Sequence, residues 1–290
     1  FVAISTEIYF GHKQLLAQQY AWLKGDLEAV NRSMTPWVVV HGHRPLYCSC
    51  DADCDSAATT NRMGIAQANG TFEFGLEKLF FEYGVDMYIA GHEHDYERMY
   101  EVSPKYDPLQ PWLSGVTTRS TVDPPATTYI VTGSAGNVED HEPFTRPSPS
   151  RSAKRLNTYG WSKMTVHNST HLLWQQLQTD NGQPSHTWGQ VMDEAWIVQR
   201  HHGPFAHHPR RREVELHGVS GLGDSEAPEH TTSAAVAAKD GATGPVAGRC
   251  QRTQHGGQPA CADQRLAVEL QRLGHWQATK VAWFEQQNFV

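Results

Sequence analysis

The sequence predicts a mixed α/β fold, in which helices and strands alternate before a final run of strands. Hydrophobic residues recur at helical spacing over residues 16–30 and 76–83. A short apolar run follows each of these segments, and further strand-like runs lie between residues 128 and 199. With 290 residues, the chain is long enough to bury a sizeable core.

The two predicted helices each present one apolar stripe. The stripe of the first consists of Leu16, Tyr20, Leu23, Leu27 and Val30. Its steps of four and three residues are typical of an amphipathic helix, and Pro36 prevents the helix from continuing. The stripe of the second consists of Leu76, Leu79, Phe80 and Tyr83. Gly84 follows directly and is predicted to cap the C-terminus of this helix.

Strands are predicted from short apolar or alternating runs. They cover residues 1–5, 37–40, 85–90, 128–132, 161–166, 171–177 and 194–199. Residues 101–127 are rich in Pro, Ser and Thr, which predicts a long surface loop. Strands separated by helices, followed by consecutive strands, favour a layered domain with a partly mixed sheet.

The character of the chain changes after residue 205. Residues 206–249 contain much Gly, Ala, Ser and Thr and few large apolar side chains, so they cannot bury enough surface to offset chain entropy. Helix-like content returns only at 266–284. We therefore expect a folded domain over 1–205 and a low-complexity, disordered tail over 206–290 that is not native to that domain.

Charge and composition exclude several partners. The formal net charge is 24 − 31 = −7, so no basic face is expected for nucleic acid or anionic lipid. No stretch approaches the ~18 apolar residues of a membrane-spanning helix. The chain contains 17 histidines, which directs attention to metal chemistry.

Two histidine clusters follow predicted strands. His41 and His43 come directly after strand 37–40, and His92 and His94 come directly after strand 85–90. Ligands in open α/β sheets gather outside the carboxyl ends of strands. Alternate residues of an extended backbone point the same way, so His92 and His94 can face one cavity. Neutral imidazole suits Zn, Fe, Mn or Cu. A histidine pair of this kind is also common on protein surfaces, where it binds no metal.

The residues around these clusters resemble those of a known family. Val40-x-x-His43 and Gly91-His92-x-His94 are similar to two metal-ligand motifs of the purple acid phosphatases, within the calcineurin-like metallophosphoesterases. The stretches that resemble the animal iron/zinc group are 1–7, 42–49, 92–98, 132–136 and 193–198. The resemblance covers about 1–205 in family order, as the C-terminal part of the catalytic domain. It implies a β-sandwich of two mixed sheets flanked by helices, incomplete here at its N-terminal side.

The resemblance also implies a set of metal ligands. His43 and His92 would bind a divalent metal (Zn, Fe or Mn), and His94 would bind Fe(III). In the family, a hydroxide that bridges the two metals attacks the phosphorus of a small phosphate monoester. The other ligands and the family's acid histidine belong to motifs upstream of residue 1. We therefore expect this chain to carry three of the seven ligand residues and an incomplete site of its own.

Neighbouring residues are open to a structural or a functional interpretation. For His41 we expect an exposed or supporting role, and for Glu93 a structural carboxylate. Arg44 and Arg98 could bind phosphate, but bracing of the histidine loops is favoured for both.

The cysteines and the sequons bear on the cellular compartment. Cys48, Cys50 and Cys54 lack a fourth ligand at zinc-site spacing. The resemblance implies a disulfide between Cys48 and Cys54. Asn31, Asn69 and Asn168 begin glycosylation sequons. The resemblance favours a secreted glycoprotein, or one in the secretory pathway or lysosome, although no signal peptide is visible.

The leading hypothesis is therefore an acid phosphatase that acts on phosphate monoesters. Two alternatives stay open: a phosphodiesterase or nucleotidase with the same dimetal centre, and a truncated, non-catalytic product. The physiological substrate and the oligomeric state do not follow from the sequence.

Overall fold

The computed structural model describes residues 1–50, 60–104, 117–137, 139–179 and 187–210. The helical elements are η1 (Glu7–Tyr9), η2 (Lys13–Leu15), α1 (Leu16–Glu28), α3 (Leu76–Tyr83) and η3 (Phe205–His207). The strands are β1 (Val2–Ala3), β2 (Val39–Gly42), β3 (Gly64–Ala66), β4 (Phe72–Phe74), β5 (Met87–Ala90), β6 (Tyr96–Val102), β7 (Thr127–Thr132), β8 (Ser152–Leu156), β9 (Gly160–Val166), β10 (His171–Gln178) and β11 (Val191–Val198).

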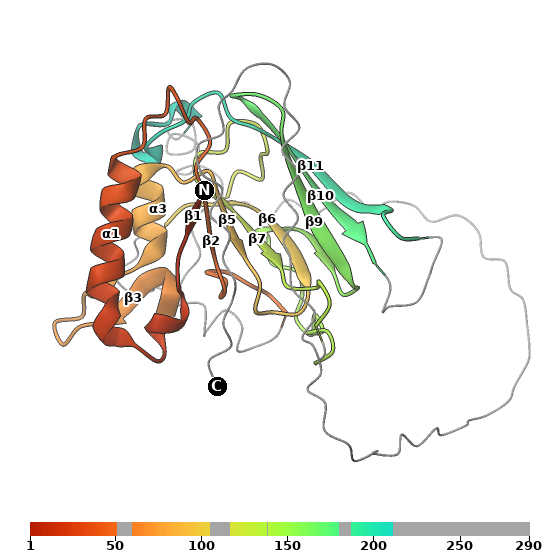
Figure 1. Cartoon of the computed structure of the whole chain (residues 1–290), viewed down its shortest axis with the longest axis horizontal. Helices are drawn as coiled ribbons and strands as arrows, with labels where there is room; N and C mark the ends of the chain where they lie inside the picture. Colours follow the sequence, from red (N-terminus) through yellow and green to blue (C-terminus); the bar gives the residue numbers. More distant parts are fainter. Residues whose placement is uncertain (51–59, 105–116, 138, 180–186, 211–290) are drawn as a thin grey trace, which may run out of the picture.

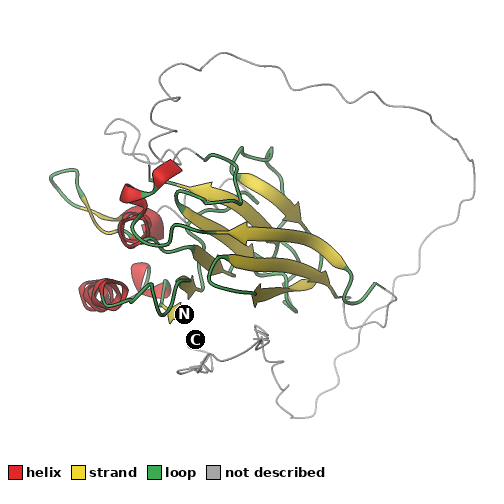
Figure 2. Ribbon diagram, turned by 90° about the horizontal axis from the view of Figure 1, so that it is seen from above, coloured by secondary structure: helices red, strands yellow, loops and turns green. Residues whose placement is uncertain are grey.

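These elements form three layers (Figure 1). Helices α1 and α3 lie on one side, the six-stranded sheet β1-β2-β5-β7-β6-β8 lies in the middle, and the three-stranded sheet β11-β10-β9 lies on the other side. The same separation of helices from strands is visible from above (Figure 2). Strands β3 and β4 form a separate hairpin. The predicted mixed α/β class is confirmed.

The two larger sheets differ in strand direction. In the central sheet, β1, β2, β5 and β7 run parallel to one another, while β6 runs antiparallel to both of its neighbours, β7 and β8. The other sheet was expected to be mixed as well, but its three strands pair antiparallel, apart from one isolated parallel bridge between Val122 and Val198 at the end of β11. The physical reason is local: a short reversal between β9 and β10 leaves no room for the crossover that parallel pairing needs.

Strand alternation divides the interior into two cores. Val38 and Val40 pack into one core with α1 and α3, whereas Val39 packs into a second core with the three-stranded sheet. In β5, likewise, Tyr88 packs into the first core, while Met87 and Ile89 pack into the second. Because successive side chains point to opposite faces, a central strand covered on both sides is apolar throughout.

The two sheets are also joined by buried polar contacts. Arg98 in β6 donates from Nε and Nη2 to the two carboxylate oxygens of Asp193 in β11, at 2.7 and 3.0 Å. The hydroxyl of Tyr96 donates to the same carboxylate at 2.7 Å and accepts a hydrogen bond from Trp174 Nε1 at 3.0 Å. Arg98 thus links the two sheets, whereas the sequence predicted that it braces the histidine loop.

Both predicted helices and all seven predicted strands are present, with shifted ends. Helix α1 ends at Glu28, before Val30. Helix α3 ends as predicted, with Gly84 in the left-handed conformation at φ 67° and its N–H donating to the Phe80 carbonyl. The short hairpin strands β3 and β4 were missed, and so were β6 and β8. Strand β6 begins inside the second histidine motif and ends inside the predicted loop, and β8 carries no apolar alternation.

The last described segment returns to the helices. Phe205 in η3 packs against Phe81 and Ala126, and a Cβ at Gly84 would lie 1.8 Å from the carbonyl oxygen of Gly203. The expected division at 205/206 stays a prediction, because 211–290 lies outside the described residues.

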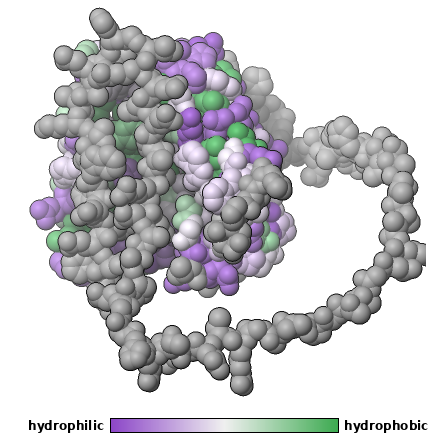
Figure 3. Space-filling model, turned by 45° about the vertical axis from the view of Figure 1, so that its right-hand side comes forward, coloured by the Kyte–Doolittle hydropathy of each residue, from purple (hydrophilic) through white to green (hydrophobic). Residues whose placement is uncertain are grey.

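Polar and apolar residues are mixed on one face of the described part. On the face shown in Figure 3, hydrophobic residues form small separate patches among hydrophilic ones. Among the described residues, no helix is long and apolar enough to cross a membrane.

Candidate functional site

Two adjacent parallel strands bring the histidine clusters together. Gly42 at the end of β2 is in register with Ala90 at the end of β5, and the Gly91 amide donates to the His43 carbonyl at 3.0 Å. Close packing requires glycine here, because a Cβ at Gly42 would lie 2.7 Å from the Tyr88 hydroxyl oxygen. The loops after both strands therefore meet at one edge of the sheet.

His43 and His92 contact each other through ring nitrogens. Nε2 of His43 lies 3.0 Å from Nδ1 of His92, and the ring centroids are 4.9 Å apart in an edge-to-face arrangement. Two imidazole nitrogens that bind one metal ion at about 2.1 Å, with an angle of 90–110°, are about 3.0–3.4 Å apart. The pair is hydrogen-bonded in this structure, and its spacing also fits a shared metal ion that would replace the hydrogen.

His92 is held in an unusual conformation and stays uncharged over a wide pH range. Its φ of 69° lies in the left-handed region, which costs a non-glycine residue about 1–3 kcal/mol and is typical of functional sites. Burial lowers its pKa to about 4, helped by the charges of Arg44 and His43 and, to a smaller extent, of His94. Above that pH the ring is in the neutral form that binds metals.

His94 is oriented by a backbone carbonyl. Its Nδ1 lies 3.2 Å from the carbonyl oxygen of Asp140, so Nδ1 carries the hydrogen and donates it. Its Nε2 lies 3.9 Å from a carboxylate oxygen of Glu139. Metal-binding histidines commonly donate their second ring nitrogen to a carbonyl in this way.

The three histidines do not form a complete metal site by themselves. Over the residues that the structure describes, no group of three or more His, Cys, Asp and Glu side chains is arranged to hold a metal ion. His43 and His92 are in direct contact, while His94 is held separately by the segment around Asp140. Further ligands are needed to complete the coordination sphere.

Two comparisons with known proteins agree on a family. Residues 3–96 match the family described as calcineurin-like phosphoesterase, and residues 126–186 match the family described as iron/zinc purple acid phosphatase-like protein C. Acid phosphatase type 7 of Danio rerio is 37% identical over 215 residues, which cover 71% of this chain and 46% of that protein. An acid phosphatase of Aspergillus ficuum is 32% identical over 190 residues, which cover 61% and 29%.

The chain belongs to the purple acid phosphatase family. It spans about half of the length of the relatives that it matches, 46% for the Danio rerio protein and 43% for its Homo sapiens counterpart. A solved purple acid phosphatase from yellow lupin seeds is also similar, with a TM-score of 0.48 and 22% identity, covering 68% of this chain and 30% of that one.

Several neighbours of the family motifs have structural contacts. His41 is exposed. The Glu93 carboxylate accepts a hydrogen bond from Cys50 Sγ at 3.2 Å. Cys48 is buried and disulfide-bonded, but Cys54 lies outside the described residues, so the pairing of Cys48 with Cys54 stays a prediction.

The three sequons share one local geometry. Asn31, Asn69 and Asn168 are exposed, and each side-chain oxygen accepts a hydrogen bond from the hydroxyl of the Ser or Thr two residues later, at 2.7, 2.7 and 3.0 Å. All three are accessible for modification, although modification itself stays a prediction.

A buried acid next to the ligand motif was not predicted from the sequence. Asp95 is 1% exposed, and neither carboxylate oxygen has a hydrogen-bond partner among the described residues. Burial raises its pKa to about 8, with further contributions from Glu97 and Glu93. The carboxyl is thus mostly protonated at neutral pH and adds little charge behind the histidines.

Sequence analysis also missed two segments that border the site. Glu139 and Asp140 approach His94 from the connection after β7, and Glu7 approaches from η1 by pairing with Arg44. The acidic run after Gly136 was a visible signal for the first segment. Nothing local in the sequence indicates the second, because the pairing spans 37 residues.

Proposed function

We propose that this chain is the C-terminal part of an acid phosphatase that hydrolyses small phosphate monoesters at a dinuclear metal centre. In this proposal His43 and His92 bind a divalent ion (Zn, Fe or Mn), and His94 binds Fe(III). The observation that carries it is the 3.0 Å approach of the His43 and His92 nitrogens at the carboxyl ends of β2 and β5. Relatives named acid phosphatase in Danio rerio and Aspergillus ficuum support the reaction class.

When bound, the two metal ions would polarise the phosphoryl oxygens and acidify water. The residues of this chain supply the scaffold. The left-handed turn at His92 presents its ring to His43, and the Asp140 carbonyl fixes the orientation of His94. Neutral His92 keeps one ring nitrogen without a hydrogen at acidic pH, since its pKa is about 4.

The location of the protein is also a proposal. Three accessible sequons and the acid phosphatase relatives support a secreted or lysosomal glycoprotein. Enzymatic deglycosylation of protein from a secreting host should shift its electrophoretic mobility, and substitution of the three asparagines should abolish that shift.

The test of the activity combines metal content with hydrolysis. The 290-residue chain is purified beside a version extended upstream to the length of its relatives, and p-nitrophenyl phosphate is compared with its diester. We expect metal bound through His43 and His92, and a monoester rate well above the diester rate. His43→Ala should lose both metal and activity, whereas His167→Ala, an exposed histidine on the far sheet, should keep both.

Other outcomes distinguish the alternatives. A higher rate with the diester would favour a phosphodiesterase. If neither version bound metal or cleaved either ester, the chain would be a non-catalytic product.

A further inference from the structure

Arg44 lies next to the histidine pair and is held by an acidic partner. Its Nε and Nη2 donate to the two carboxylate oxygens of Glu7 at 2.7 and 3.2 Å. Its remaining terminal nitrogen, Nη1, lies 2.8 Å from Nε2 of His92. The guanidinium group therefore spans the distance between a carboxylate in η1 and a histidine of the candidate metal centre.

Further contacts fix the backbone of Arg44 and one side of its planar guanidinium group. Its N–H donates to the Thr6 hydroxyl at 2.8 Å, and its carbonyl accepts a hydrogen bond from the Tyr88 hydroxyl at 2.8 Å. The guanidinium carbon lies 4.4 Å from the centre of the Phe10 ring. The Arg44 side chain nevertheless keeps 24% of its surface exposed. Arg44 is thus positioned in advance and remains accessible.

The contact between Arg44 and His92 determines which nitrogen carries the hydrogen. Arginine only donates hydrogen bonds, so Nε2 of His92 accepts and Nδ1 carries the hydrogen that faces His43. A metal ion bound at Nε2 would displace Arg44 directly. If the ion were bound at Nδ1, Nε2 would carry the hydrogen and could no longer accept from Arg44. In both cases Nη1 loses its acceptor when His92 becomes a ligand.

We propose that Nη1 of Arg44 then donates to a phosphoryl oxygen of the substrate, which makes Arg44 a substrate-binding residue. Glu7 and Phe10 are its positioning residues. This inference rests on the proposed function. A guanidinium group suits phosphate because it combines a permanent charge with directional donors. It should favour the dianion of a monoester over the single charge of a diester.

The first test measures binding of inorganic phosphate by calorimetry to the metal-loaded, upstream-extended protein. Arg44→Gln should weaken phosphate binding by about 10–100-fold, the range for a lost charge-assisted hydrogen bond. Arg44→Lys should recover part of that loss. Lys24→Gln removes one exposed positive charge on α1 and should bind phosphate as the unaltered protein does. Metal content is measured for every variant.

The second test measures specificity. The ratio of kcat/KM for p-nitrophenyl phosphate to kcat/KM for its diester should fall at least about 10-fold in Arg44→Gln, since only the contact with the dianion is lost. A purely structural role would lower both rates together.

Three results would overturn the proposal. Unchanged phosphate affinity in Arg44→Gln with normal metal content would refute it and leave the proposed function intact. Metal loss confined to Arg44→Gln would mean that Arg44 supports the ligands instead of binding substrate. Absence of metal and of hydrolysis in the unaltered extended protein would refute both proposals together.

Discussion

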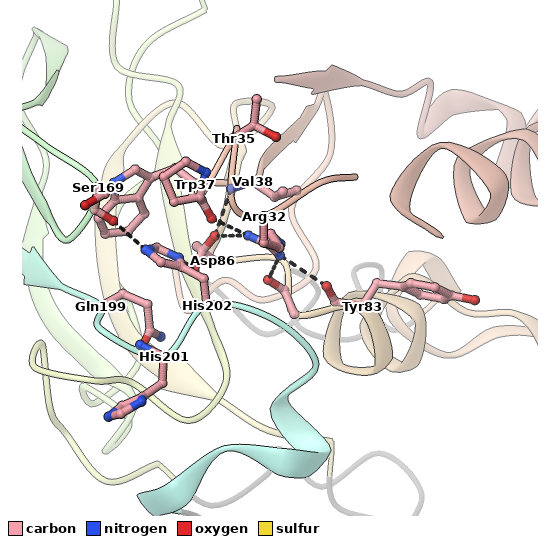
Figure 4. Close-up of polar contacts among 12 residues, drawn as sticks. Arg32, Thr35, Trp37, Val38, Tyr83, Asp86, Ser169, Gln199, His201 and His202 are labelled. Atoms are coloured by element: carbon pink, nitrogen blue, oxygen red, sulfur yellow. Dashed lines mark hydrogen bonds and ion pairs between the residues drawn. The ribbon is translucent and has the colours of Figure 1, made fainter. Parts of the chain in front are cut away.

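Similar residue types gather at the two ends of strands β2 and β5, but the two groups differ in burial and in hydrogen bonding. At the carboxyl ends, His43 and His92 meet Arg44 and Glu7. At the amino ends, Asp86 meets Arg32 and His202 (Figure 4). Each group combines histidine, arginine and a carboxylate, yet only one of them lies where the family motifs place a metal centre.

The amino-end group is buried and has its polar atoms satisfied. Asp86 accepts hydrogen bonds from Arg32 Nη1 at 2.7 Å, from the Val38 amide at 2.8 Å and from His202 Nδ1 at 3.0 Å. Arg32 also donates to the carbonyls of Pro36, Tyr83 and Gly84. The His202 Nε2 atom lies 2.7 Å from the Ser169 carbonyl oxygen. Among the described residues, no buried side-chain atom of Arg32, Asp86 or His202 lacks a hydrogen-bond partner, so this group is a closed structural network.

The carboxyl-end group differs in exposure. The Glu7 side chain is 48% exposed, against 3% for Asp86. In this group, His43 and His92 contact each other through their ring nitrogens, and a metal ion bound between the rings can replace that contact. The difference teaches that residue types alone do not identify a site, whereas exposure and replaceable contacts do.

The largest expected effect is on stability at the amino ends. Asp86→Ala leaves Arg32 and His202 without their shared carboxylate, and loss of one partner from a buried ion pair costs about 3–5 kcal/mol. Urea unfolding measures this change. Asp26→Ala, an exposed carboxylate on α1, is the matched control. A loss below about 1 kcal/mol for Asp86→Ala would contradict the structural role.

The next largest effect is on metal binding at the carboxyl ends. His43→Ala should weaken metal binding more than about 100-fold, beyond the ~10–100-fold loss seen when a residue that orients a ligand is removed. Stability without metal should change little, since the His43 side chain is exposed. Calorimetric metal titration and urea unfolding of the same variant separate the two effects. A large loss of stability with unchanged metal affinity would mean that His43 has a structural role, like Asp86 at the opposite ends of the strands.

A third prediction concerns the ion pair between Arg98 and Asp193, whose expected effect lies between those at the two strand ends. Burial raises the pKa of Asp193, but the hydrogen bond and charge of Arg98 outweigh it and lower the pKa below the ordinary value. This pair stabilises the fold above about pH 4 and loses that contribution as pH falls through the lowered pKa.

Stability measured from pH 6 to pH 2 should therefore decline less steeply in Asp193→Asn than in the unaltered protein, by about 1–2 kcal/mol. Parallel curves for the two proteins would show that Asp193 is not the titrating group.

The smallest expected effect is the stability change of Arg44→Lys. An exposed ion pair contributes about 0–1 kcal/mol, so the loss should stay below about 0.5 kcal/mol. Arg32→Lys should cost more, because lysine cannot reproduce four directed contacts at once. Equal losses at the two arginines, measured by thermal unfolding, would remove the distinction between the two ends.

Much of the fold could be predicted because its signals are local. The apolar stripes of α1 and α3 and the glycine cap at Gly84 depend on near neighbours in the chain. Strands β6 and β8 were missed because pairing with other strands stabilises them, and their own sequences carry no clear strand pattern. Strand β6 is buried between β7 and β8, and β8 has no apolar alternation.

By itself, the sequence determined the fold class, the family and the identity of His43, His92 and His94 as candidate ligands, since motif spacing and hydrophobic periodicity are written along the chain. Only the tertiary structure decided that Glu7 reaches Arg44, that Arg44 reaches His92, and that Asp86 and His202 close the opposite end. These contacts join residues 37 to 116 positions apart, so chain packing and not local preference creates them.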